Sequence, residues 1–134
     1  MRWLDCWLGR GPGEAHAEHA AGAQRWVVLD VEPSGLDHPS AGLMSIGAVG
    51  VHDRRIVVAD SLELTIRQSS ASERQNILVH GIGAEAQLSG LDPKQACRQF
   101  LDYVGRSPLV AFHASFHRAV LMRAAKAFVG VPIG

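Results

Sequence analysis

The chain has 134 residues, a length that is enough for one domain with a core but not for two. Of these residues, 47% are hydrophobic and 19% are charged. Thirteen basic residues balance thirteen acidic ones, so the net charge gives no reason to expect binding to nucleic acid or to a membrane surface. Any anionic partner must therefore be held by a local patch or by a metal ion.

The first 24 residues are predicted to form a short helix and a flexible linker ahead of the domain. The opening eight residues lack the apolar stretch of a signal peptide, and we expect an amphipathic helix that docks through its Trp and Leu side chains. Glycines and a proline follow, which is typical of a linker. His16 and His19 have a spacing compatible with a metal site, but a solvated tract is the simpler interpretation because no third ligand is fixed nearby.

Cysteine usage and apolar runs bear on the cellular setting. Cys6 and Cys97 lie far apart and form no CxxC unit. The longest apolar stretches are far shorter than a membrane span. We therefore expect a reduced, cytoplasmic setting with no membrane partner.

Hydrophobic patterning predicts an α/β domain over residues 25–134. An antiparallel meander of three strands comes first, then a short helix, a longer helix, a fourth strand and a last helix. Asp92 is the expected N-cap of the longer helix and Gly105 its end. The predicted ranges are Trp26–Val31, Leu43–His52, Ile56–Arg67, Asn76–Ile82, 93–104, Pro108–Phe112 and Ser115–Phe128. The side chains of the last helix that are expected to face inward are Phe116, Val120, Leu121, Ala124, Ala125 and Phe128.

The end of the first strand carries two carboxylates, Asp30 and Glu32. Because successive strand side chains point to opposite faces, these two share a face while Val31 points the other way. Neighbouring carboxylates repel each other unless a cation lies between them, and hard divalent ions prefer oxygen ligands. The pair therefore indicates a metal site, although taken alone it is also compatible with a cap and a surface acid.

Four segments, in this order, resemble the DnaQ-like DEDD 3′→5′ exonucleases of the DEDDh type. The segments are 27–37 (Val-Val-Leu-Asp-Val-Glu-Pro-Ser-Gly-Leu-Asp), Met44–Val49, Val79–Ile82 and Leu109–His117. The similarity runs from about residue 25 to about residue 128. It implies an RNase H-like mixed sheet with flanking helices, incomplete at the C-terminus of this chain.

The resemblance also implies an activity and a set of ligands. Proteins of this family hydrolyse phosphodiester bonds at nucleic-acid 3′ ends by a two-metal mechanism, so Mg²⁺ or Mn²⁺ would be held by Asp30 and Glu32. The implied partners are single-stranded DNA or RNA 3′ ends and a polymerase or another protein. The implied substrate-binding residues are Ser34, Gly35, Leu36, His80, Gly81, Ile82 and Phe116.

Three departures from the family pattern lead us to expect weak or absent activity. Pro33 replaces the usual Thr and removes an N–H that could bond to substrate. His117 stands at the position of the second-motif Asp, and neutral imidazole is a poor ligand for Mg²⁺ though acceptable for Mn²⁺ or Zn²⁺. The final motif, a His followed by an Asp on a last helix, is expected beyond residue 134.

Plainer roles and other functions stay open at this point. His80 is interpreted as structural or substrate-proximal, and His113 as capping the last helix or packing near the site. Arg118 and Arg123 fit a solvated face, with guidance of a phosphate backbone as the alternative. A second hypothesis for the whole chain is a non-catalytic remnant that binds nucleic-acid ends or a partner protein, and a third is a degenerate fragment that folds poorly.

Overall fold

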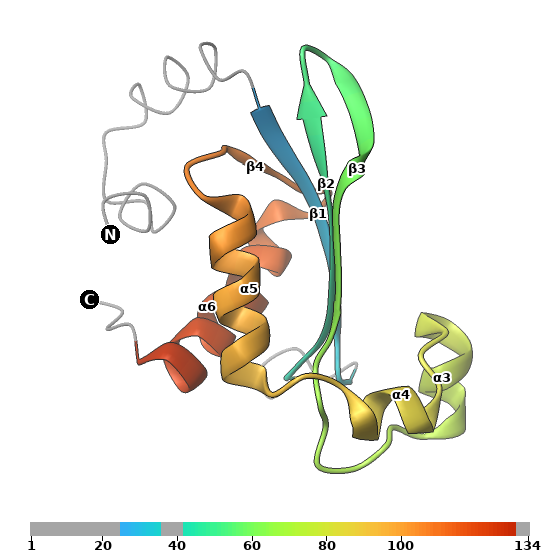
Figure 1. Cartoon of the computed structure of the whole chain (residues 1–134). Helices are drawn as coiled ribbons and strands as arrows, with labels where there is room; N and C mark the ends of the chain where they lie inside the picture. The colour runs from blue at the N-terminus through green and yellow to red at the C-terminus, as the bar shows by residue number, and fades with distance from the viewer. Residues whose placement is uncertain (1–24, 36–41, 131–134) are drawn as a thin grey trace.

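The computed structural model describes residues 25–35 and 42–130 (Figure 1). Its elements are β1 (Arg25–Pro33), β2 (Leu43–His52), β3 (Arg55–Thr65), α3 (Arg74–His80), α4 (Ala84–Ser89), α5 (Pro93–Val104), β4 (Leu109–Val110) and α6 (Ala114–Val129). None of the described helices is long and apolar enough to cross a membrane. The predicted docking helix and linker at residues 1–24 lie outside the described residues.

The four strands form one mixed sheet in the order β3-β2-β1-β4. β1 pairs antiparallel with β2, and β2 pairs antiparallel with β3, which confirms the predicted meander. β4 runs parallel to β1 on its other side, with Val27 opposite Leu109 and Val28 opposite Val110. β1 therefore lies in the interior of the sheet and is paired on both sides.

Helices α5 and α6 cover one face of this sheet (Figure 1). The β1 side chains on that face, Val27, Leu29 and Val31, are buried. The helix residues that complete the core are Ala96, Phe100 and Val104 of α5 and Val120, Leu121 and Ala124 of α6. The alternate β1 side chains point to the opposite face, which no helix covers within the described residues, and we call this the open face.

Helix α5 begins and ends where the sequence predicts. The Asp92 carboxylate accepts hydrogen bonds from the backbone N–H groups of Lys94 (3.0 Å) and Gln95 (3.2 Å), and Pro93 occupies the first helical position. Gly105 ends the helix with a φ of 55°, which glycine adopts at little cost. These local signals fix where α5 begins and ends. Its buried side chains, Ala96, Phe100 and Val104, pack into the core against the sheet.

The remaining elements differ from prediction in a few places. β4 is shorter than expected because the chain turns at His113 into α6. The sequence does not predict helix α4, because the buried residue of this helix is the polar Gln87 and so leaves no apolar pattern. Phe128 was expected inward, and this is wrong: it is 38% exposed, because the last turn of α6 extends past the sheet (Figure 1).

A polar network ties the hairpin end of the sheet to α5. Arg25 pairs with both carboxylate oxygens of Asp60, at 2.7 Å from Nε and 2.9 Å from Nη2. Arg25 Nη1 donates to the Tyr103 carbonyl (3.2 Å) and to the Ser107 hydroxyl (2.8 Å). The Tyr103 hydroxyl donates to the Asp60 carbonyl at 2.8 Å, and His52 Nε2 lies 2.6 Å from Asp60 Oδ2. Asp60, through its carboxylate and its backbone carbonyl, thus links β1, the β2–β3 hairpin and α5.

Gly50 of β2 makes room for this carboxylate. The pairing of β2 with β3 shifts register between Val49 and Gly50. A Cβ atom at Gly50 would overlap the Asp60 carboxylate, so any side chain there would displace it.

The network predicts a pH-dependent stability. Hydrogen bonds from Arg25 and His52 hold the pKa of the Asp60 carboxyl well below its ordinary value of 3.8. A lowered pKa stabilises the fold above the ordinary value, and this contribution is lost as the pH falls below it toward the lowered pKa. We expect Asp60→Asn to reduce the free energy of unfolding at pH 7 by about 1–3 kcal/mol. Urea unfolding should show this deficit shrinking between pH 5 and pH 2, whereas a constant deficit would mean that the charge is not responsible.

Candidate functional site

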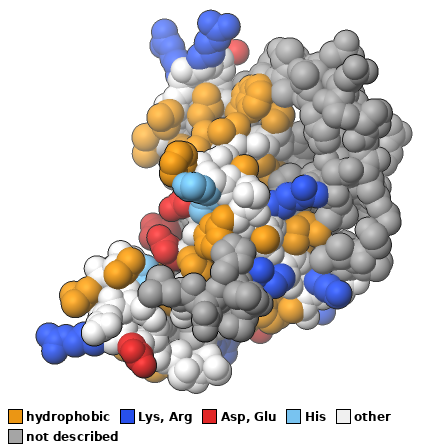
Figure 2. Space-filling view, turned by 180° about the vertical axis from the view of Figure 1, so that it is seen from behind, with side chains coloured by type: hydrophobic (Ala, Val, Ile, Leu, Met, Phe, Trp, Pro, Cys, Tyr) orange, Lys and Arg blue, Asp and Glu red, His pale blue; other side chains and the backbone are white. Residues whose placement is uncertain are grey.

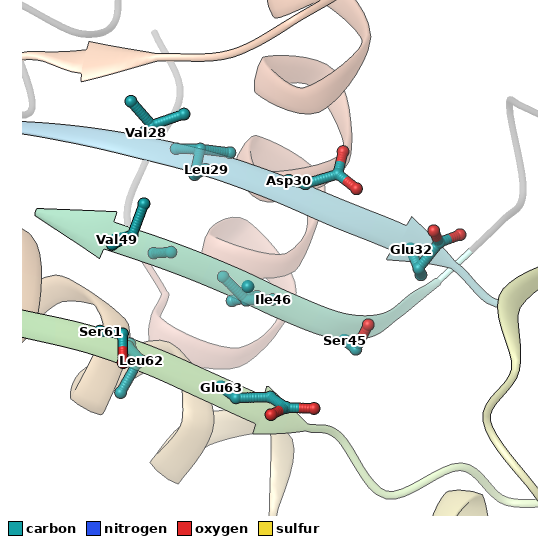
Figure 3. A pocket seen from close by; sticks show the side chains of 12 residues that line it. Val28, Leu29, Asp30, Glu32, Ser45, Ile46, Val49, Ser61, Leu62 and Glu63 are labelled. Atoms are coloured by element: carbon teal, nitrogen blue, oxygen red, sulfur yellow. The ribbon is translucent and has the colours of Figure 1, made fainter. Parts of the chain in front are cut away.

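Acidic side chains gather near the middle of one side of the molecule, next to histidine and hydrophobic side chains (Figure 2). Asp30 and Glu32 project from the open face near the end of β1 (Figure 3). The Asp30 side chain is 74% exposed, and Glu32 is partly buried. The prediction that these two carboxylates share one face is confirmed.

His117, in the first turn of α6, reaches Asp30. Its Nε2 atom lies 3.2 Å from Asp30 Oδ1, and its side chain is only 8% exposed. The ring of Phe116 contacts the imidazole edge-on, with centroids 5.3 Å apart. The structure therefore brings together the first-motif acid and the residue that the sequence comparison places at the second-motif position.

The other ring nitrogen of His117 has no hydrogen-bond partner. Nδ1 is buried, and no described group bonds to it. A neutral ring that carries its proton on Nε2, toward Asp30, leaves Nδ1 as an acceptor without a donor, and a protonated ring leaves it as a donor without an acceptor. Such a buried polar atom costs about 1–3 kcal/mol, so His117 is held at this position by its surroundings at some expense in stability.

A third carboxylate, Glu63 of β3, lies on the same face. The register places Gly47 of β2 opposite both Asp30 and Glu63, so no side chain separates the two acids on this row. Residues of β1, β2 and β3 line a shallow open hollow of about 500 Å³ here (Figure 3). Sequence reasoning missed Glu63, although its alternation with Leu62 and Leu64 indicates the open face once the register is known.

The His80-Gly81-Ile82 segment forms the turn between α3 and α4. His80 Nδ1 accepts a hydrogen bond from the Ile82 N–H (3.0 Å), so Nε2 carries the proton and donates to the Ser72 hydroxyl (3.1 Å). Gly81 ends α3 with a φ of 73°. Buried Gln87 also bonds to Ser72 and to the Ile82 carbonyl. Both ring nitrogens of His80 are thus used inside the protein, and a role toward substrate stays a prediction.

The other predicted substrate-binding residues are placed differently. Ser34 exchanges backbone and side-chain hydrogen bonds with Gly42 across the base of the following loop. Gly35 is the last described residue before that loop, and Leu36 lies outside the described residues. Phe116 is partly buried and packs against the core, so its described surroundings are the protein interior and the His117 ring.

The pair of Asp30 and Glu32 fits one divalent cation. Mg²⁺ commonly keeps several waters and takes only one or two carboxylates, with substrate phosphate completing its shell. Within residues 25–35 and 42–130, no group of three or more His, Cys, Asp or Glu side chains is arranged to hold a metal. Asp30 and Glu32 supply the type of oxygen ligand that such a cation prefers.

Comparisons with known proteins agree with this geometry. No family model matches the chain. The chain is 32% identical over 91 residues to the PolC-type DNA polymerase III of Thermotoga petrophila, which covers 68% of this chain and 6% of that protein. It is similar to a structure of exonuclease I, with a TM-score of 0.65 and 9% identity over 77% of this chain and 24% of the other. For E. coli exonuclease I in complex with a dT13 oligonucleotide the TM-score is 0.64 at 11% identity, with the same coverage.

These likenesses define the class of fold. The chain has the RNase H-like fold of the DnaQ-like exonucleases, and the predicted fold class is confirmed. It spans 24% of the length of exonuclease I and 6% of the length of the polymerase.

The Asp30–His117 contact predicts a specific change in metal binding. His117→Asp would add an oxygen ligand and a negative charge beside Asp30, so we expect divalent cations to bind about tenfold more tightly. Titration calorimetry with Mn²⁺ would measure this. His117→Asn, which adds no charge, is the control, and equal affinity in both variants would contradict the expectation.

Proposed function

We propose that the chain is an exonuclease-like domain that hydrolyses phosphodiester bonds at 3′ ends of single-stranded DNA or RNA, with weak activity. Asp30 and Glu32 hold Mg²⁺ or Mn²⁺ in this proposal. The observation that carries it is the meeting of Asp30, Glu32 and His117 at one strand end of a DnaQ-like fold. A single-stranded substrate is supported by the solved complexes of E. coli exonuclease I with dT13 and dA16 oligonucleotides.

The described residues support both the proposed chemistry and its expected weakness. When bound, a divalent cation polarises the scissile phosphoryl oxygen and acidifies an attacking water. Asp30 and Glu32 supply negative oxygen ligands at that point. His117 supplies no negative charge, and its Nε2 atom lies 3.2 Å from Asp30 Oδ1, where it would compete with a cation for that oxygen. Metal affinity and turnover are therefore expected to be low.

Seating of the terminal nucleotide is proposed for the segments that flank the carboxylates. Ser34, Gly35 and Leu36 follow Glu32 in the sequence after Pro33. Gly81 and Ile82 are proposed for the same role, and they lie in the turn between α3 and α4, where the Ile82 N–H bonds to His80 and the Ile82 carbonyl to Gln87.

The alternative proposal is a non-catalytic remnant that binds nucleic-acid ends or a partner protein such as a polymerase. The contact of His117 with Asp30 favours it, because an imidazole nitrogen 3.2 Å from a carboxylate oxygen competes with a cation for that oxygen. A protein partner is supported by the match to PolC-type polymerase III and by the solved complex of exonuclease I with SSB-Ct.

A nuclease assay separates these proposals. With Mn²⁺ and 5′-labelled dT and rU oligonucleotides, we expect slow shortening from the 3′ end by the full chain. Asp30→Ala and Glu32→Gln should reduce the rate at least about 100-fold because each removes a metal ligand.

Glu63→Gln is the matched control, since it changes a carboxylate of the same face that has no assigned part in the reaction. Shortening that survives Asp30→Ala would contradict the role given to Asp30. An oligonucleotide that binds to the wild-type chain without being shortened would support the remnant instead.

A further inference from the structure

An exposed aromatic ring, Phe112, lies between β4 and α6 and has no part in the function proposed above. Its exposed fraction is 84%, the highest of the large exposed hydrophobic side chains in the described residues. Single exposed apolar residues are common and need no special explanation. The position of Phe112 relative to Asp30 is what distinguishes this one.

The pairing of β1 with β4 leads the chain toward Asp30. Val28 pairs with Val110 across β1 and β4, and both point to the open face, with 38% and 41% exposed. Two residues further along the chain are Asp30, in β1, and Phe112, in the turn that follows β4. Ala111, between Val110 and Phe112, packs against the core, so the alternation continues past the end of β4. Neighbouring strands lie about 5 Å apart, so the turn that carries Phe112 follows β4 along the side of β1 where Asp30 lies.

The backbone and one neighbour hold the Phe112 ring outward. His113 adopts a left-handed conformation, with φ 52° and ψ 48°, and turns the chain sharply into α6. Its imidazole contacts the Phe112 ring edge-on, with centroids 4.4 Å apart and planes at 81°. A T-shaped neighbour covers at most one face of the Phe112 ring, so at least one face stays free for another planar group.

An exposed aromatic ring near a site proposed for phosphate, such as Asp30 and Glu32, suits a nucleotide. Nucleobases stack on exposed aromatic rings, and each stacked base contributes strongly to single-strand binding without regard to sequence. Val28 and Val110 extend the apolar surface along the sheet behind the ring. A nucleotide with its phosphate at Asp30 would carry its base within reach of this surface.

We propose that Phe112 is a stacking platform for a nucleobase adjacent to the phosphate that lies at Asp30 and Glu32. This inference rests on the proposed function, because it assumes that a nucleic-acid 3′ end occupies the open face. It assigns a base subsite to a residue outside the carboxylate motifs, with Val28 and Val110 as its apolar floor.

Binding in EDTA tests the subsite without hydrolysis. Fluorescence anisotropy with 5′-labelled dT10 and rU10 would give the dissociation constants of the wild type and variants. We expect Phe112→Ala to weaken binding about 5- to 100-fold and Phe112→Trp to preserve it. Phe128→Ala, which removes another exposed aromatic ring at the far end of α6, should leave binding unchanged.

An abasic oligonucleotide shows whether the ring contacts a base. With an abasic residue at the last or the penultimate position, the deficit of Phe112→Ala should vanish for the position whose base stacks. Wild-type affinity in Phe112→Ala overturns the inference and leaves the proposed function standing. An equal deficit with every abasic oligonucleotide, or a change in oligomeric state without a change in affinity, also overturns it. Failure of the wild type to bind any oligonucleotide, both in EDTA and with Mn²⁺ present, would instead remove the proposed function itself.

Discussion

The alternation of side chains along β1 couples the core of this protein to its candidate site. One face of the strand supplies Val27, Leu29 and Val31 to the helices, and the other presents Asp30 and Glu32. Because β1 is paired on both sides, its backbone cannot rotate or slip by one residue without exchanging the two sets. Such a slip would bury two carboxylates and expose three aliphatic side chains, so the burial of the core also fixes the direction of the acids.

Two aspartates of the sheet show how different partners give the same side chain different roles. Asp60 receives a bidentate Arg25 and a histidine, and it links three elements at one end of the fold. Asp30 is mostly exposed, and its described partner is a single imidazole. The first arrangement uses both carboxylate oxygens in holding the fold together. The second leaves carboxylate oxygen available to a ligand, which is the property that a binding site needs.

Local signals explain why much of the fold could be predicted from the sequence. The meander follows from strand alternation, and α5 follows from its Asp92-Pro93 start and Gly105 end. Helix α4 could not be predicted in this way, because burial of Gln87 depends on hydrogen bonds to Ser72 and Ile82 that leave no periodic pattern. The parallel pairing of the two-residue β4 is likewise a long-range contact.

The candidate site, too, has one part that local signals predict and another that depends on long-range contacts. The shared face of Asp30 and Glu32 follows from alternation alone. The approach of His117 to Asp30 joins distant parts of the chain, and only the family resemblance pointed to it. Glu63 belongs to this face because of a register between three strands, which residue spacing within one strand does not reveal.

Gly47 leaves a gap in the row between Asp30 and Glu63, and it differs in one respect from Gly50 of the same strand. At Gly50 an added Cβ would meet a carboxylate, whereas at Gly47 it would meet no atom within 4 Å. The fold therefore tolerates a side chain at this point of the open face. A cysteine introduced at Gly47 would carry a spin label or fluorophore between the two acids, so that whatever enters the hollow could be observed directly by spectroscopy.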